Sequence, residues 1–154
     1  MIGSSQLDLT ETKLDDLASP AGTDEPRRNV LFVDDESNIV SACKRALRRV
    51  GCKIFTTTDT AEAIALAKEN EFAVVVSDQR MPIMEGTELL ERIREIQPDS
   101  IRIILTGYAD ISAAIDAINK GAVWRFMSKP WDDEQLRSTI KAAVSQFNLS
   151  LIHI

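Results

Sequence analysis

The chain is poor in side chains that bind soft metal ions. It has two cysteines, Cys43 and Cys52, and one histidine, His153. The cysteines form no C-x-x-C pair and the histidine lies far from both, so they cannot supply the four ligands of a structural zinc site. Cys43 falls on an apolar stripe at helical spacing, and we expect it to be a buried free thiol.

An excess of positive charge is also absent. Lysine and arginine total 18 against 24 aspartates and glutamates, a net charge of -6. Because nucleic-acid backbones favour clustered basic side chains, we expect no direct nucleic-acid binding by this chain. The sequence does not open on a basic region followed by an apolar run, and no apolar run approaches the length of a membrane span. These absences favour a cytoplasmic protein without a membrane partner.

The first 27 residues have few apolar side chains. Ser, Thr, Asp, Glu and Pro dominate, and leucines are scattered between positions 7 and 17. This composition cannot bury enough surface to fix a fold, so we predict a disordered acidic tail over residues 1–27. The leucines leave a short helix or a docking segment open. Residues 28–154 are long enough for one domain with a hydrophobic core.

The rest of the chain alternates between two apolar patterns. Short continuous apolar runs predict five buried strands, over residues 29–33, 53–57, 73–78, 101–106 and 123–129. Apolar residues at helical spacing predict five helices, over residues 39–50, 60–70, 89–96 and 111–118, and from residue 136 to the end of the chain. The alternation indicates an α/β fold with a doubly wound, five-stranded parallel sheet. We expect the flavodoxin-like strand order 2-1-3-4-5 with five helices.

Polar side chains stand at the ends of four of the predicted strands. Asp34 and Asp35 come directly after the first strand, Asp78 ends the third, Thr106 ends the fourth and Lys129 ends the fifth. In a parallel sheet these ends meet at one edge, where α/β proteins bind ligands. One polar residue at a strand end is usually the start of a loop, but four such ends together indicate a functional site.

The residue types at this edge predict metal-assisted phosphoryl transfer. Three neighbouring carboxylates repel one another unless a cation joins them, and Mg²⁺ prefers oxygen ligands. An aspartate can act as a nucleophile and form an acyl phosphate. The transferred group needs positive charge and hydrogen-bond donors, which Lys129 and Thr106 can supply.

These motifs resemble the receiver domain of bacterial two-component response regulators. The resemblance rests on Asp34-Asp35, the run DQRMPIMEG that starts at Asp78, Thr106-Gly107 and Lys129-Pro130. It covers about residues 29–147. It implies a phosphorylation-activated switch that relays its state to an output domain or partner, and that catalyses only its own phosphorylation and dephosphorylation.

The resemblance also implies a phosphoryl acceptor and a metal site. Asp78 would accept the phosphoryl group from the phosphohistidine of a sensor histidine kinase or a phosphotransfer protein. Asp35, Asp78 and the backbone carbonyl of Arg80 would bind Mg²⁺ directly, and Asp34 would act through a bound water.

Five positions in all match further parts of the family's pattern. Lys129 would pair with the phosphoryl oxygens, Thr106 would move to hydrogen-bond them, and Phe126, at the switch-aromatic position, would repack. Arg80 and Tyr108 stand two residues beyond the aspartate and the threonine, where they flank the attacking water. We hypothesise that this large pair slows self-dephosphorylation. The alternative is an exposed arginine and a partly packed tyrosine.

Residues between these motifs narrow the resemblance. SDQRMP, LTGYAD, AINKG and KPW are similar to receivers attached to HD-type cyclic-di-GMP phosphodiesterase domains, and to some receivers of hydrogenase regulators. An output domain of such a kind is therefore one expectation. We expect Trp124 to be a packing residue on the fifth strand, and Trp131 to be either a packing residue or a partner contact.

The last predicted helix stays apolar to its end, FNLSLIHI. A free helix end would more naturally turn polar, so we expect a dimer helix or a receiver cut from a longer chain. A homodimer through the fourth helix, fifth strand and fifth helix stays open, as does a stand-alone receiver that works by docking a partner.

Two other classes fit the sequence less well. A phosphohydrolase that uses an aspartyl-phosphate would need an acid where Arg80 stands. A flavodoxin-like cofactor binder would not place the acidic loop DDESN, which starts at Asp34, beside a phosphate.

Overall fold

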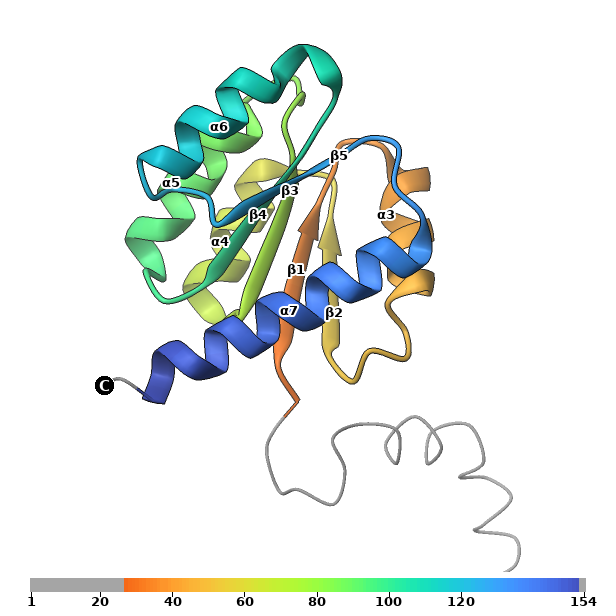
Figure 1. Cartoon of the computed structure of the whole chain (residues 1–154), viewed down its shortest axis with the longest axis vertical. Coiled ribbons are helices and arrows are strands. Elements are labelled where there is room, and N and C mark those ends of the chain that lie inside the picture. Colours follow the sequence, from red (N-terminus) through yellow and green to blue (C-terminus); the bar gives the residue numbers. More distant parts are fainter. Residues whose placement is uncertain (1–26, 153–154) are drawn as a thin grey trace, which may run out of the picture.

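A five-stranded parallel sheet forms the centre of the domain (Figure 1). The computed structural model describes residues 27–152, so the predicted tail, apart from Arg27, and His153 lie outside the described residues. The strand order is β2-β1-β3-β4-β5, which confirms the predicted topology. The strands are β1 (Asn29–Val33), β2 (Lys53–Thr57), β3 (Val74–Asp78), β4 (Ile101–Thr106) and β5 (Arg125–Ser128).

Helices cover both faces of the sheet (Figure 1). They are α3 (Ser37–Ala46), α4 (Thr60–Glu69), α5 (Gly86–Ile96), α6 (Ile111–Asn119) and α7 (Asp133–Ile152), with a short 3₁₀ helix η1 (Tyr108–Asp110) before α6. On β1, Phe32 packs on the α3 and α7 side, while Leu31 packs on the side of α4, α5 and α6. Successive strand residues point to opposite faces, so the continuous apolar runs fill two cores. Among the described residues, every helix is too short or too polar to cross a lipid bilayer.

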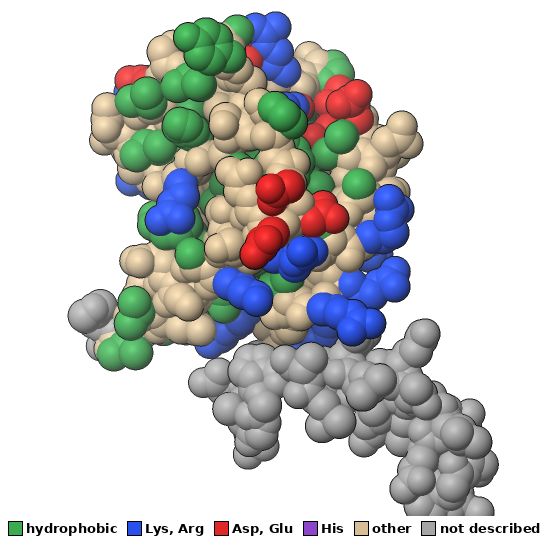
Figure 2. All heavy atoms as spheres, turned by 45° about the vertical axis from the view of Figure 1, so that its right-hand side comes forward, with side chains coloured by type: hydrophobic (Ala, Val, Ile, Leu, Met, Phe, Trp, Pro, Cys, Tyr) green, Lys and Arg blue, Asp and Glu red, His purple; other side chains and the backbone are tan. Residues whose placement is uncertain are grey.

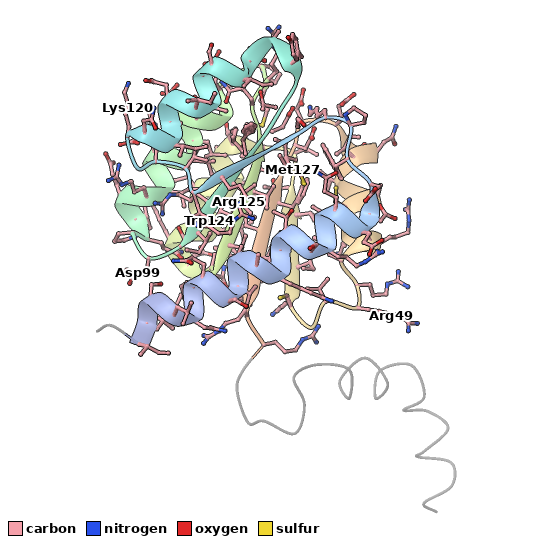
Figure 3. All side chains as sticks on the ribbon, viewed as in Figure 1. Arg49, Asp99, Lys120, Trp124, Arg125 and Met127 are labelled. Atoms are coloured by element: carbon pink, nitrogen blue, oxygen red, sulfur yellow. The ribbon has the colours of Figure 1, made fainter. Side chains whose placement is uncertain are left out.

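Within residues 27–152, two predicted elements extend more than one residue beyond an end of the observed ones. The first helix ends at Ala46 and a turn follows it, which leads to Gly51 at φ 88°. The fifth strand begins at Arg125, so the placement of Trp124 on it is wrong. Trp124 instead lies just before the strand, under the Arg125 guanidinium, which sits 4.0 Å from the centre of its ring (Figure 3). The prediction that Trp124 packs is confirmed, because it and Trp131 are partly buried against the core beneath α3 and α7.

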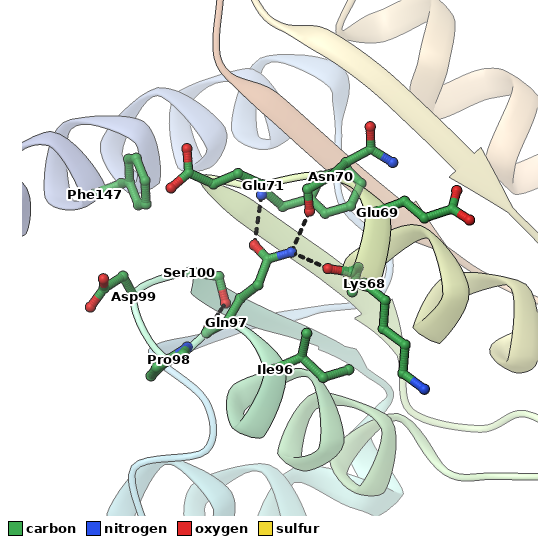
Figure 4. A pocket seen from close by; sticks show the side chains of 12 residues that line it. Lys68, Glu69, Asn70, Glu71, Ile96, Gln97, Pro98, Asp99, Ser100 and Phe147 are labelled. Atoms are coloured by element: carbon green, nitrogen blue, oxygen red, sulfur yellow. Dashed lines mark hydrogen bonds between the residues drawn. The ribbon is translucent and has the colours of Figure 1, made fainter.

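At the amino edge of the sheet, opposite the carboxyl edge, two side chains form hydrogen bonds to backbone carbonyls of neighbouring segments. Gln97, after α5, accepts a hydrogen bond from the Phe72 amide at 2.7 Å and donates to the carbonyls of Ala67 and Asn70 (Figure 4). Arg102, buried on β4, donates to the Ala122 carbonyl at 2.8 Å. It also donates to the carbonyl oxygen of Ser100 at 2.8 Å and to its hydroxyl at 2.9 Å. Burial lowers the pKa of Arg102, but these acceptors satisfy the guanidinium without a carboxylate. The sequence reasoning missed this buried cation.

Cys43 is a buried free thiol, as predicted. It packs with α7 residues in the core beneath α3. Burial is the main cause that raises the pKa of the thiol to about 12, and the charge of Asp34 adds to the rise. A thiol with such a pKa stays protonated near neutral pH, which agrees with a packing role.

Gly86 is required by close packing beside the carboxyl edge. Its amide donates to the Gln79 carbonyl at 2.9 Å, which fixes the start of α5. A Cβ atom here would overlap the carbonyl oxygen of Asp78 and lie 2.6 Å from the Cδ1 of Ile104. The helix therefore approaches the end of β3 more closely than any side chain would permit.

We predict that Gly86→Ala lowers the free energy of unfolding by about 1–3 kcal/mol, because the added methyl group must displace β3 backbone. Urea unfolding followed by circular dichroism measures the change. The matched control is Gly107→Ala, where a Cβ atom meets nothing within 4 Å. We expect a change within about 0.5 kcal/mol there. Equal effects of the two substitutions would contradict the packing argument.

Candidate functional site

Three carboxylates meet at the carboxyl edge of the sheet. Asp34 and Asp35 follow β1, and Asp78 is the last residue of β3. The two strands pair in parallel with Val33 opposite Ser77, so the acids arrive at the same level. One oxygen from each carboxylate lies within 4.8 Å of the other two. Sheet pairing therefore brings together residues that are more than 40 positions apart, as the sequence predicted.

The three acids differ in their surroundings. Asp34 is fully buried and Asp78 is 3% exposed, whereas Asp35 is exposed. Asp34 Oδ1 accepts a hydrogen bond from the Glu36 amide at 2.9 Å, which fixes the entry into α3. Asp34 Oδ2 is buried and has no hydrogen-bond partner among the described residues. An unpaired buried carboxylate oxygen is costly unless a cation or water meets it.

Burial and crowding of like charges control the electrostatics of the site. Burial raises the pKa of Asp34 to about 6, the Glu36 amide opposes this, and the charge of Asp78 adds to it. Lys129 Nζ lies 2.5 Å from Asp78 Oδ1 as an ion pair. Burial lowers the pKa of Lys129, but the hydrogen bond to Asp78 and the charges of Asp78, Asp34 and Glu36 together outweigh burial and raise the pKa overall. The lysine is therefore charged at neutral pH and offsets one of the carboxylates.

The residues fit a magnesium ion. One lysine is the only cation in ion-pair contact with the three acids within residues 27–152, so negative charge remains uncompensated. The partnerless Asp34 Oδ2 is an oxygen that a hard cation or its bound water would satisfy. A hollow beside the cluster is lined by Asp35, by Arg80, Met81, Pro82 and Glu85 of the loop after β3, and by Asp110 of η1.

The two switch positions lie on neighbouring strands. Thr106 ends β4, is fully buried, and donates from its hydroxyl to the Gly107 carbonyl at 3.1 Å. Asp78 pairs with Leu105 in the β3–β4 register, so the threonine lies one step beyond the acid. Phe126 on β5 pairs with Ile104 on β4. It is partly buried and packs against the core beneath α4, α5 and α6.

Arg80 is held by an acid that the sequence reasoning missed. Arg80 Nε lies 2.7 Å from Asp110 Oδ2, and its Nη2 lies 3.3 Å from Oδ1, which makes a bidentate pair. The hydrogen bond from Arg80 lowers the pKa of Asp110. The pair joins the loop after β3 to the segment after β4. Tyr108, in that segment, is 91% exposed.

An acidic cluster with a paired lysine, at the carboxyl edge of a 2-1-3-4-5 parallel sheet, defines a class of phosphorylation-controlled signalling domain. The chain belongs to the response regulator receiver domain family, whose model matches residues 30–141. It is therefore a receiver domain of the two-component type, a phosphorylation-activated switch.

Relatives with known sequences are similar to this chain over part of their length. The hydrogenase transcriptional regulatory protein HoxA of Bradyrhizobium diazoefficiens is 32% identical over 120 residues, which is 78% of this chain and 24% of that protein. The chain thus spans about a quarter of the curated relatives it matches.

Solved structures match the same fold. The signal receiver domain of an HD domain-containing protein from Pseudomonas fluorescens Pf-5 has a TM-score of 0.79 at 30% identity, and the match covers 88% of this chain and 99% of that one. The beryllofluoride-activated NtrC4 receiver domain dimer has a TM-score of 0.71 at 35% identity, with 77% and 98% covered. Receivers of hydrogenase regulators and of HD-domain proteins are both among the matches, as the short motifs indicated.

We predict that Asp34→Asn stabilises the metal-free domain at neutral pH. The pKa of Asp34 is raised from 3.8 to about 6 in the folded state, so its protonation stabilises the fold at low pH. That stability is lost as the pH rises from about 4 through about 6, and an amide does not titrate. The free energy of unfolding, measured by urea from pH 4 to 8, should therefore fall less with pH in the variant.

Added Mg²⁺ gives the second half of this test. Wild-type protein should gain stability with Mg²⁺ by mass action, and Asp34→Asn should gain less. The exposed acid Asp99 supplies the control, because Asp99→Asn should leave both the pH slope and the response to Mg²⁺ unchanged. Identical pH slopes in wild type and Asp34→Asn would contradict the account of the cluster.

Proposed function

We propose that Asp78 is the phosphoryl acceptor of this receiver domain and that Mg²⁺ binds beside it. One observation carries the proposal: a buried carboxylate at the end of the central strand contacts the Lys129 ammonium at 2.5 Å and has two more carboxylates beside it. A sensor histidine kinase or a phosphotransfer protein is the donor. The proposed location is the cytoplasm.

In the proposed transfer, an oxygen of Asp78 attacks phosphorus and the phosphorus–nitrogen bond of the donor phosphohistidine breaks. The bonding electrons return to the imidazole nitrogen. Lys129 holds the carboxylate in place and then neutralises charge on the phosphoryl oxygens. Asp35, Asp78 and the Arg80 carbonyl would hold the ion, and Asp34 would act through a bound water. When bound, Mg²⁺ supplies positive charge that the phosphoryl oxygens need.

The new phosphoryl group changes the packing of β4 and β5. Thr106 gives up its bond to the Gly107 carbonyl and donates to a phosphoryl oxygen instead, and Phe126 repacks into the vacated space. This shifts the face made by α6, β5 and α7 between two arrangements. Ile115 on α6, 46% exposed, is an apolar side chain available to a partner.

Another domain, a partner protein or a second copy of this chain senses the phosphorylation state of the domain through this face. The similarity to the receiver of an HD domain-containing protein supports an HD-type output, which we propose to be a cyclic-di-GMP phosphodiesterase, and the similarity to HoxA supports a transcriptional regulator. The dimeric NtrC4 receiver supports a homodimer through the face of α6, β5 and α7 or through the end of α7. A stand-alone receiver that docks a partner is the other candidate.

An aspartyl-phosphate phosphohydrolase is disfavoured by the residue beside the nucleophile. Arg80 stands where such an enzyme needs a proton donor, and its guanidinium donates two hydrogen bonds to Asp110. An arginine keeps its proton at any accessible pH, so it cannot act as a general acid. The proposed activity is therefore limited to the domain's own phosphorylation and dephosphorylation.

We predict that acetyl phosphate with Mg²⁺ adds one phosphoryl group to the wild-type protein, as seen by intact-mass spectrometry, and adds none to Asp78→Asn. The amide cannot form an acyl phosphate, while its size preserves the fold. Asp99→Asn is the control and should label as the wild type does. Labelling that persists in Asp78→Asn would rule out Asp78 as the acceptor.

We predict that Arg80→Ala and Tyr108→Ala each shorten the acyl-phosphate half-life about threefold or more, because each exposes the path of the attacking water. The half-life is followed by loss of the adduct mass after the donor is removed. Arg92→Ala is the control, since Arg92 is exposed on α5 and pairs only with Glu88 in the described part of the chain. If neither variant changes the half-life, crowding by this pair plays no part.

A further inference from the structure

Basic residues are concentrated in one segment of the domain. Between Glu36 and Asp59 the sequence has no acidic residue and five basic ones: Lys44, Arg45, Arg48, Arg49 and Lys53. They stand at the end of α3, in the turn after it and at the first position of β2, and all five are exposed. We call these five residues the α3 basic surface.

The α3 basic surface faces solvent. Figure 2 shows lysine and arginine side chains gathered on the lower right of one face, and Arg49 extends away from the domain in Figure 3. Within residues 27–152, the ion pairs involve Arg80, Arg92, Arg94, Lys120 and Lys129, and none includes the α3 basic surface. Five neighbouring positive charges without an acid among them attract a polyanion.

Arg27 joins the α3 basic surface. Its guanidinium donates to the Cys52 carbonyl at 3.0 Å. A hollow of the surface is lined by Arg27 with three basic residues of α3 and its turn, by Lys53, and by the less polar Ser41, Cys52 and Ile54. Arg28 is fixed as well, because its Nε donates to Asn148 Oδ1 at 3.1 Å. The polypeptide that precedes Arg27 is therefore attached to the domain at the edge of this surface.

That preceding polypeptide carries the opposite charge. Residues 1–26 contain six acidic residues and one lysine, a net charge of -5, whereas the whole chain has -6. Residues 27–154 are thus nearly neutral, with 17 basic and 18 acidic residues. Almost all of the net negative charge lies in the one segment that is joined to the basic surface.

We propose that residues 1–26 of the same chain bind the α3 basic surface. The reach of 26 residues is on the order of 80 Å, whereas ten residues of α3 span about 15 Å, so the segment can extend along the whole helix. Attachment at Arg27 places the acids at an effective concentration on the order of millimolar, which a separate partner must exceed to compete. The bound segment covers the α3 basic surface and keeps nucleic acids and acidic proteins from it. Salt weakens the binding of the segment, because it screens the charges.

Zero-length carbodiimide cross-linking of the full chain tests the contact. The reagent couples carboxylates to lysines that already touch, and peptide mass spectrometry locates the links in the monomer fraction. We expect Asp8, Glu11, Asp15 or Asp16 to couple to Lys44 or Lys53. The links should fade in about 1 M NaCl, where the Debye length is about 3 Å. Lys68 is the internal control, because it is exposed on α4, which covers the other face of the sheet.

Three results would overturn the proposal. One is coupling of the segment to Lys68 as often as to Lys44 and Lys53, and another is no coupling at all. The third is coupling that joins ¹⁴N-labelled to ¹⁵N-labelled chains in a mixed sample, which would make a second copy the occupant.

A variant of the full chain gives an independent readout. Substitution of Asp8, Glu11, Asp15 and Asp16 by their amides removes charge from the segment and leaves the domain intact. We expect this variant to bind a fluorescent DNA duplex at least about tenfold more tightly than wild type at low salt, because the α3 basic surface is uncovered. Adding Arg48→Gln and Arg49→Gln should reverse the gain, whereas Arg92→Gln should not. Equal duplex affinities of wild type and variant would contradict the proposal, because the segment would then not cover the α3 basic surface.

Discussion

The repulsion among three carboxylates is the constraint on which this structure depends. Asp34, Asp35 and Asp78 are held within 4.8 Å at the carboxyl edge, and two of them are buried. In water such charges would move apart. Here β1 and β3 pair in parallel within a sheet that helices cover on both faces, and this arrangement keeps the carboxylates together. Burial is the main cause that raises the pKa of Asp34, the charge of Asp78 adds to the rise, and Lys129 contacts Asp78 at 2.5 Å. The fold thus holds a site that favours added positive charge.

The same confinement explains how a small chemical change reaches a distant surface. Asp78, Thr106 and Phe126 are carried by three adjacent strands, and Gly86 brings α5 against the carbonyl of Asp78 without space for a methyl group. In the proposed switch, a phosphoryl group on Asp78 cannot be accommodated locally, because a tightly packed core has discrete alternative arrangements rather than a continuous range. Thr106 and Phe126 are the positions where we propose that the packing changes.

Much of this was predictable from the sequence, because the information is local. Continuous apolar runs mark strands buried on both faces, and their ends placed the acids, the threonine and the lysine correctly. Three features were missed because they depend on contacts between distant segments. Arg102 is buried on carbonyls of two turns, and Asp110 binds Arg80 from another loop. Trp124 precedes β5 because pairing with β4 begins only at Arg125, opposite Ile103.

The most direct measurement locates the phosphoryl group on the chain. Borohydride reduces an aspartyl phosphate to homoserine, and peptide mass spectrometry identifies the position that has changed. After treatment of wild-type protein with acetyl phosphate and Mg²⁺, we expect homoserine at position 78 and at no other acid. Homoserine at Asp34 or Asp35, or none at all while the intact protein carries the adduct, would contradict it.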